Sequence, residues 1–187
     1  MSIALATRRF TVEEYHRMGE AGILGPEDRV ELLDGEVVEM SPIGREHAAC
    51  VARLDQYFQL RLQGRVHVRV QNPVRLSDHS EPEPDVALVR PHEDFYVAGH
   101  PSPADVFLLV EVADSSLAYD RRTKVPQYAA AGIPEVWVVD LTTRTVEVFR
   151  RPGPKGYDEC RRASIGDSIA PACFLDCSLR LDQILGK

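Results

Sequence analysis

Residues 106–140, VFLLVEVADSSLAYDRRTKVPQYAAAGIPEVWVVD, hold two apolar runs on either side of a segment with helical character. The runs at 106–112 (VFLLVEV) and 136–140 (VWVVD) are nearly all apolar, which is typical of strands covered on both faces. The segment between them closes at Gly132 and Pro134, which are helix-stop residues. This pattern predicts a β-α-β unit whose two strands are parallel and central.

Weaker patterns extend the predicted sheet on both sides of this unit. Strict polar and apolar alternation at 66–70 predicts a strand with one buried face, and 86–89 predicts another strand. The segments TVEVFRR and YDECRRAS predict an antiparallel continuation, and LRLDQILGK predicts a short final helix.

The amino-terminal part predicts two helices and a hairpin. Thr11 and Glu14 have capping-box spacing, so a first helix is expected at 12–21. Asp34-Gly35 within RVELLDGEVVEM is the pair that best tolerates the positive φ angles of a type I′ turn, which predicts a β-hairpin. Apolar residues recur at helical spacing over 48–62, which predicts a long amphipathic helix.

Composition indicates one globular domain. The chain has 187 residues with 44% hydrophobic content, enough to bury a core without disulfides or a structural metal. We expect a single domain over 1–187, with a core at about 10–150 and carboxy-terminal strands and a short helix at 151–187. The first ten residues carry only a short apolar run, so we expect a soluble, cytoplasmic protein with no membrane partner. The scattered positions of Cys50, Cys160, Cys173 and Cys177 favour reduced, mostly buried thiols over a metal site.

The net charge of −7 argues against a protein that holds nucleic acid by bulk electrostatics, because phosphate contacts need a basic face. Cations held by carboxylates would offset part of the repulsion, and several arginines could still gather on one face. These are Arg61, Arg65, Arg69, Arg75, Arg121 and Arg122.

Two carboxylates have unusual settings. Glu111 lies inside an apolar run, where an ionised group costs several kcal/mol to bury unless it is paired or binds a metal. An ion pair with an arginine, or a position at the strand end in contact with water, explains Glu111 as well as a functional role does. Asp85 follows Pro84 and opens a strand, a position that more often serves turn chemistry.

A helix would place Asp120, Lys124 and Tyr128 on one face, although a solvated face is the more common meaning of such spacing. Pro126 requires this helix either to begin close to Lys124 or to kink there. Glu31 is expected to be a solvated strand residue.

His47, near the start of the long helix, is expected to be exposed or to cap the helix, and spacing alone does not support a pairing with Glu31.

The ordered series ELLDGEVVEMSPIGREH, EPDVALV and LLVEVADSSLAYDRRTKVPQYAAAGIPEVWVVD resembles the Uma-type restriction endonuclease family. That family belongs to the restriction-endonuclease-like superfamily with its PD-(D/E)xK signature. The resemblance covers about residues 10–150 and is most specific over 111–140. It implies an α/β fold in which helices flank a central mixed β-sheet, with an amino-terminal helix and β-hairpin.

The resemblance also implies a site. Asp85 matches the Asp of the PD pair and Glu111 the acidic residue on the next core strand. Ala113 stands where the signature has lysine, and Lys124 on the following helix takes its place. The two carboxylates and the Val112 carbonyl would bind Mg²⁺, or Mn²⁺ as a substitute. Glu31, Gln71 and Asp120 would support the site.

Two functions of different kinds follow from these observations. The first is a magnesium-dependent endonuclease that hydrolyses DNA phosphodiester bonds, which we expect to act as a homodimer because two strands must be cut. The second is a catalytically inactive binding or interaction module that keeps the fold, which the acidic charge and Ala113 favour. Sequence specificity would have to come from loops such as 79–83 or 95–105.

Overall fold

The computed structural model describes residues 7–25, 27–114 and 116–186. Residues 1–6, on which the expectation of a cytoplasmic protein partly rests, lie outside these ranges. Ser115 of the predicted crossover helix and Lys187, the last residue of the predicted final helix, also lie outside them. No helix in the described ranges is both long and apolar enough to cross a membrane.

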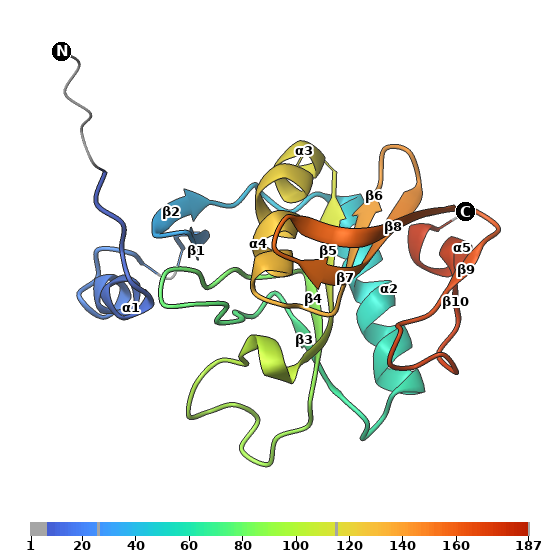
Figure 1. Cartoon of the computed structure of the whole chain (residues 1–187), viewed down its shortest axis with the longest axis horizontal. Helices are drawn as coiled ribbons and strands as arrows, with labels where there is room; N and C mark the ends of the chain where they lie inside the picture. The colour runs from blue at the N-terminus through green and yellow to red at the C-terminus, as the bar shows by residue number, and fades with distance from the viewer. Residues whose placement is uncertain (1–6, 26, 115, 187) are drawn as a thin grey trace.

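A six-stranded mixed sheet forms the centre of the molecule, in the order β3-β4-β5-β6-β7-β8 (Figure 1). The prediction of a parallel central pair is confirmed, because β5 and β6 are parallel and occupy the middle. Every other neighbouring pair in this sheet is antiparallel. The strands are β3 (His67–Val70), β4 (Val86–Val89), β5 (Val106–Ala113), β6 (Glu135–Asp140), β7 (Thr145–Gly153) and β8 (Gly156–Ser164).

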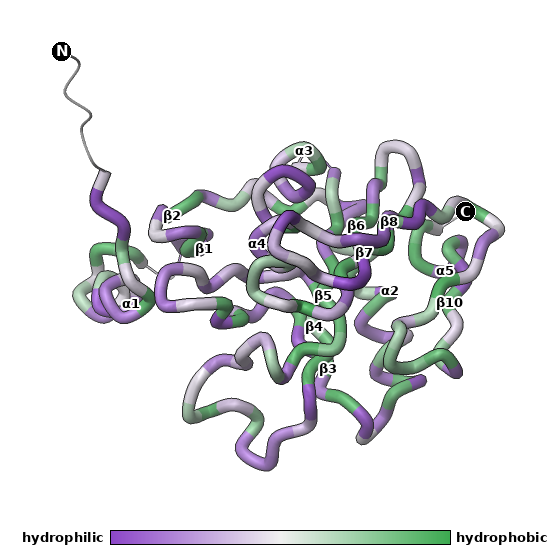
Figure 2. The backbone as a smooth tube through the Cα atoms, viewed as in Figure 1, coloured by the Kyte–Doolittle hydropathy of each residue, from purple (hydrophilic) through white to green (hydrophobic). Residues whose placement is uncertain are grey.

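Alternation along β5 assigns its side chains to two buried layers. Val110 and Val112 pack in the layer that contains α2 (Arg45–Arg61), whereas Leu109 and Ala113 pack in the layer that contains α4 (Val125–Ala130). Figure 2 shows hydrophobic residues concentrated along β3, β4 and β5, in the middle of the fold. Glu111 alternates with Val110 and Val112, so its side chain lies on the α4 side of the sheet.

The first helix and the hairpin predicted in the amino-terminal part are confirmed. Helix α1 (Val12–Glu20) begins with both capping-box hydrogen bonds between Thr11 and Glu14. Strands β1 (Val30–Leu33) and β2 (Glu36–Glu39) form the hairpin, with φ angles of 49° at Asp34 and 76° at Gly35. In Figure 1 these elements lie together at one end of the molecule, beside the central sheet.

The expectation that Glu31 is solvated is wrong. A bridge between Leu32 and Glu81 joins β1 to the segment that leads into β4, and this contact covers Glu31, whose exposed fraction is 2%. The same packing buries Ser80, Glu81 and Pro82, so residues 79–83 do not form the open loop that was expected to read DNA. Most of residues 95–105 remains exposed, with Phe95 and Val97 turned to solvent, although Pro101 is buried.

The crossover between β5 and β6 is helical but irregular. It consists of α3 (Leu117–Tyr119), a π-helical turn η2 (Asp120–Lys124) and α4, and the Val125 amide donates to the Asp120 carbonyl. Pro126 has no amide hydrogen to continue the ladder, and it occupies the first turn of α4, where that loss is tolerated. The chain therefore remains helical past the proline by widening one turn.

The carboxy-terminal elements complete the same core. They are β9 (Ser168–Ile169), β10 (Leu179–Arg180) and α5 (Leu181–Leu185), which follow β8 in the sequence. The short 3-10 turn η1 (Pro103–Asp105) lies much earlier, directly before β5. Leu179, Leu181 and Ile184 pack in the buried layer that contains Trp137 of β6. Glu135 links this region to the sheet, because its carboxylate accepts from Trp137 Nε1 at 2.7 Å, Arg150 Nη2 at 2.8 Å and the Ala172 amide at 2.5 Å.

The four cysteines are all free thiols, as expected. Cys50 and Cys177 are buried, but Cys160 and Cys173 are exposed. The expectation of mostly buried thiols therefore holds for half of them, because Cys160 lies on the outermost strand β8 and Cys173 lies in an irregular segment.

Candidate active site

One cavity of about 390 Å³ collects the residues that the sequence singled out. Its walls come from the β1–β2 hairpin, the loop before α2, the segment before β4, the end of β5 and the crossover helix. The predicted site residues that line it are Glu31, Gln71, Asp85, Glu111, Val112, Asp120 and Lys124.

Lys124 connects two of these acids. Its Nζ atom lies 3.0 Å from Glu31 Oε2 and 3.3 Å from Glu111 Oε1, and the exposed fraction of its side chain is 7%. Burial lowers the pKa of Lys124, but the two facing carboxylates raise it more, so the ammonium form is favoured. Spacing alone favoured a solvated helix face, but the Lys124 side chain is buried.

Glu111 is buried on the sheet face beneath the crossover helix. Its Oε1 atom accepts from Lys124 and from the Tyr128 hydroxyl, the latter at 2.5 Å. Burial raises the pKa of Glu111 to about 8 against the opposing effect of Lys124. The buried acid is therefore paired with a lysine and a tyrosine, and the arginine partner considered from the sequence is replaced by these two groups.

Asp85 is held from three directions. Its Oδ2 atom accepts from the Val112 amide at 2.8 Å. Val112 is the residue that follows Glu111 in the sequence. Its Oδ1 atom accepts from Gln71 Nε2 at 3.2 Å and lies 3.1 Å from His47 Nε2. Asp85 therefore bridges the β4 and β5 strands at the cavity, so its role exceeds local turn chemistry.

Asp120 and Glu31 are fixed by neighbouring groups. Asp120 Oδ2 accepts from the Ser116 hydroxyl at 2.7 Å, and burial raises the pKa of Asp120. Glu31 Oε2 accepts from the Glu83 amide at 3.0 Å in addition to Lys124. These contacts come from α3, the crossover helix, the hairpin and the segment before β4, so the site depends on the whole fold.

His47 is a site residue that sequence reasoning missed. It was expected to be exposed or to cap the helix, but it pairs with Asp85 and its side chain has an exposed fraction of 14%. Hydrogen bonding to Asp85 raises the pKa of His47, and burial opposes this shift. The spacing of His47 with Val51, Leu54 and Phe58 places it on the buried stripe of α2, and this signal could have identified it.

The charge and chemistry of the cavity fit a hard divalent cation. Seven acidic residues and two basic residues, Arg29 and Lys124, line it. Three of these acids, Glu31, Glu111 and Asp120, are buried, and burying carboxylates so close together is costly without a counter-ion. Carboxylate and carbonyl oxygens are the ligands that Mg²⁺ and Mn²⁺ prefer, and Asp85, Glu111 and the backbone at Val112 supply them.

One comparison with known proteins identifies a family. The family model Uma2, described as "Putative restriction endonuclease", matches residues 12–182. No curated protein shows significant similarity to the chain.

A solved structure shares the fold. It is a crystal structure from Anabaena variabilis ATCC 29413, described as "a putative nuclease belonging to DUF820". It is 14% identical, with a TM-score of 0.73, over 94% of this chain and 97% of that chain. The likeness shows a shared α/β fold, in which helices flank a central mixed β-sheet as the sequence resemblance implied. Since the family model spans nearly the whole described molecule, this chain belongs to the Uma2 family.

Proposed function

We propose that the chain is a metal-dependent endonuclease that hydrolyses phosphodiester bonds of DNA in the cavity between the hairpin and the crossover helix. The observation that carries the proposal is the convergence of two acids and one ammonium group. Asp85 hydrogen bonds to the residue that follows Glu111, and Lys124 lies 3.3 Å from Glu111 itself. The family supports a nuclease, and the proposal adds the metal, the substrate and the residue roles.

Asp85, Glu111 and the Val112 carbonyl would hold Mg²⁺, for which Mn²⁺ would substitute. When bound, the cation supplies a nucleophilic water near neutral pH and stabilises charge on the phosphate. The Gln71 and His47 side chains would orient Asp85, since both contact its Oδ1 atom. Asp120 and Glu31 would support the acidic wall of the cavity.

Lys124 would act as a fixed positive charge. Its raised pKa keeps it protonated at neutral pH, and a protonated amine cannot accept a proton from water. The ammonium group instead is suited to hold the scissile phosphate and to stabilise the charge that develops there. Of the roles open to this lysine, electrostatic stabilisation is therefore favoured over general-base catalysis.

Plasmid cleavage tests the proposal. Purified protein is incubated with supercoiled DNA and Mg²⁺ or Mn²⁺, beside Asp85→Asn, Lys124→Gln and the control Asp158→Asn on the exposed strand β8. We expect the first two variants to lose at least about 100-fold in rate, since each removes an electrostatic element of the site. Asp158→Asn should cleave like the wild type. Equal cleavage by Asp85→Asn and the wild type would refute the assignment.

The acidic charge and Ala113 keep an inactive interaction module as the second candidate. Calorimetric titration with Mg²⁺ and Mn²⁺ separates the two. A nuclease should bind either cation and lose that binding in Glu111→Ala, whereas the module should bind neither. Light scattering after size exclusion tests the homodimer that double-strand cleavage would favour.

A further inference from the structure

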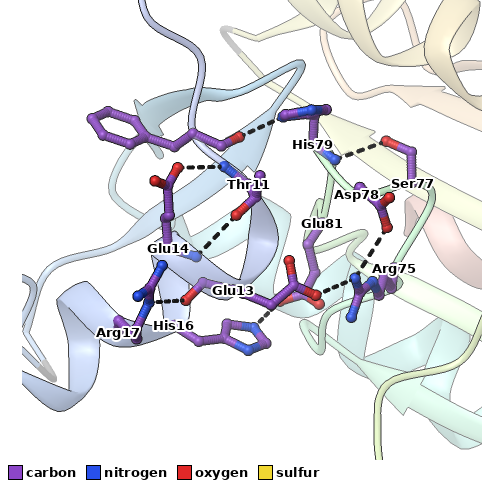
Figure 3. A network of polar contacts seen from close by, with 11 residues as sticks. Thr11, Glu13, Glu14, His16, Arg17, Arg75, Ser77, Asp78, His79 and Glu81 are labelled. Atoms are coloured by element: carbon purple, nitrogen blue, oxygen red, sulfur yellow. Dashed lines mark hydrogen bonds and ion pairs between the residues drawn. The ribbon is translucent and has the colours of Figure 1, made fainter.

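A second group of metal-binding side chains lies outside the cavity. It consists of His16 on α1, Glu81 in the segment bridged to β1, and His100 in the loop before η1. Their ligand atoms all lie within 4.8 Å of one another. Among the described residues, no other group of three histidine, cysteine or carboxylate side chains meets this geometry. Figure 3 shows the His16 ring directed at the Glu81 carboxylate.

The Glu81 carboxylate is an unusual anchor. Its residue has an exposed fraction of 2%, and its backbone is fixed by the Glu81 amide donating to the Leu32 carbonyl at 2.8 Å. One carboxylate oxygen, Oε1, lies 2.6 Å from His16 Nε2. Within the described ranges the other oxygen, Oε2, is buried and has no hydrogen-bond partner. A carboxylate oxygen that is buried without a hydrogen-bond partner destabilises the fold, and a bound cation would supply the missing partner.

Neighbouring charges do not supply the missing partner. Arg75 is engaged by Glu13 and Asp78, as Figure 3 shows. His100 packs edge-on to His16, with 6.2 Å between the ring centroids.

We propose that His16, Glu81 and His100 form a binding site for a zinc-class divalent cation. Two imidazoles and one carboxylate are a known donor set for Zn²⁺, and they leave a fourth position for water. Tetrahedral ligands at about 2.0–2.2 Å from the metal lie roughly 3.3–3.6 Å apart. Both histidines are exposed, so rotation of their side chains can close the wider separation, and the ion can enter from solvent.

Such an ion would cross-link distant parts of the chain, and we call this cross-link the clip. The three ligands come from segments that are far apart in the chain, and one of them begins the Glu81–Asp85 segment that reaches the cavity. The clip would tie α1 and the end of the exposed 91–102 loop to this segment. The predicted role is structural, and it is independent of the proposed nuclease activity.

Cobalt spectroscopy and zinc titration test the site in the full chain. The background is Asp85→Asn, so that the cavity contributes little to binding. Zinc affinity is measured by competition with a chromophoric chelator, and Co²⁺ reports geometry through its visible absorption. The variants are His16→Asn, His100→Asn and the control His92→Asn, which alters an exposed histidine of the same loop that pairs with Asp94.

We expect one zinc equivalent per chain, a tetrahedral cobalt spectrum, and at least about a 10-fold loss of affinity in each of the two ligand variants. His92→Asn should bind like its parent. Thermal unfolding in excess chelator should show all variants folded, and zinc should raise the melting temperature of the parent and of His92→Asn alone. The proposal is overturned if the parent binds no zinc, or if His16→Asn and His100→Asn bind it with undiminished affinity.

Discussion

Tyr128 donates a hydrogen bond to a carboxylate that lies in the interior of the protein, and this contact can be isolated by removing one oxygen atom. Tyr128→Phe keeps the ring in its buried layer but leaves Glu111 with Lys124 as its remaining hydrogen-bond donor among the described residues. We expect the free energy of unfolding in urea to fall by about 1–3 kcal/mol, the cost of depriving a buried acceptor of one of its donors.

Tyr119→Phe is the matched control for this measurement. Tyr119 lines the same cavity from the preceding turn, but in the described structure its hydroxyl makes no hydrogen bond. Its removal should change the unfolding free energy by less than about 0.5 kcal/mol. Equal effects of the two substitutions would show that the Tyr128 hydroxyl contributes nothing particular to the Glu111 carboxylate.

The four thiols should divide by reactivity. Burial raises the pKa of Cys50 to about 12, so at pH 8 almost none of it is the reactive thiolate. Cys160 and Cys173 are exposed. Iodoacetamide labelling followed by peptide mass mapping should modify these two first, and Cys50 and Cys177 should react only after unfolding. Fast labelling of Cys50 in the native protein would contradict its placement against the sheet.

The glycine of the β1–β2 turn allows a test at the level of one hairpin. A Cβ at Gly35 would lie 2.4 Å from Arg9 Cβ, at a φ of +76°. Gly64, at the end of the α2 region, has a φ of +75° but nothing within 4 Å of the same position. Gly64→Ala therefore measures backbone strain alone, about 1 kcal/mol, whereas Gly35→Ala adds a steric conflict with the chain before α1.

We expect Gly35→Ala to lower the unfolding free energy by at least about 1 kcal/mol more than Gly64→Ala, since overpacking typically costs that much. Chemical denaturation of both variants provides the comparison. Because β1 carries Glu31, cation binding in the cavity should also weaken in Gly35→Ala. Indistinguishable stabilities would mean that the segment before α1 moves aside at no cost.

Regular elements were predictable because local patterns determine them. The capping box, the Asp34-Gly35 turn and the apolar runs of β5 and β6 each carry their own signal, and the structure contains all of them. Burial of Glu31 was not predictable from its strand, since a segment fifty residues later covers it. The π-helical turn was likewise hidden, although Pro126 indicated that the helix had to deviate there.

The site was predictable to the degree that its residues have local anomalies. Glu111 stands out because it interrupts an apolar strand, and the resemblance placed Asp85 and Lys124 beside it. Their distances, and the pairing of His47 with Asp85, depend on strand order and on the packing of α2. Spacing along one chain carries no information on such contacts between distant elements.

At the scale of the whole molecule, Glu135 joins the sheet to the carboxy-terminal region through Arg150, whose Nη2 atom also donates to the Ala170 carbonyl at 2.7 Å. Arg150→Met would leave a carboxylate with an exposed fraction of 1% without its cation. We expect a loss of about 3 kcal/mol in unfolding free energy, as for other pairs in which one buried charge remains.

The adjacent arginine is the control. Arg151 pairs with Glu159, but both side chains are well exposed, at 67% and 47%. Arg151→Met should cost less than about 1 kcal/mol, because solvent screens such a pair. Differential scanning calorimetry should therefore separate two substitutions of the same kind at neighbouring positions. Similar melting temperatures of the two variants would show that the Glu135–Arg150 pair does not stabilise the contact between the sheet and the carboxy-terminal region.

The direction of the Lys124 side chain depends on the number of residues in the π-helical turn at Asp120–Lys124. A turn that closes over five residues holds one residue more than the neighbouring α-helical turns. Deleting one residue there would restore uniform α-helical winding and leave α3 and α4 nearly in phase, because the wider turn has already absorbed the extra residue. In a regular helix the same extra residue would instead rotate α4 and the Lys124 side chain by about 100° relative to α3. The π-helical turn therefore lets this crossover carry one additional residue while the Lys124 ammonium group still faces Glu31 and Glu111.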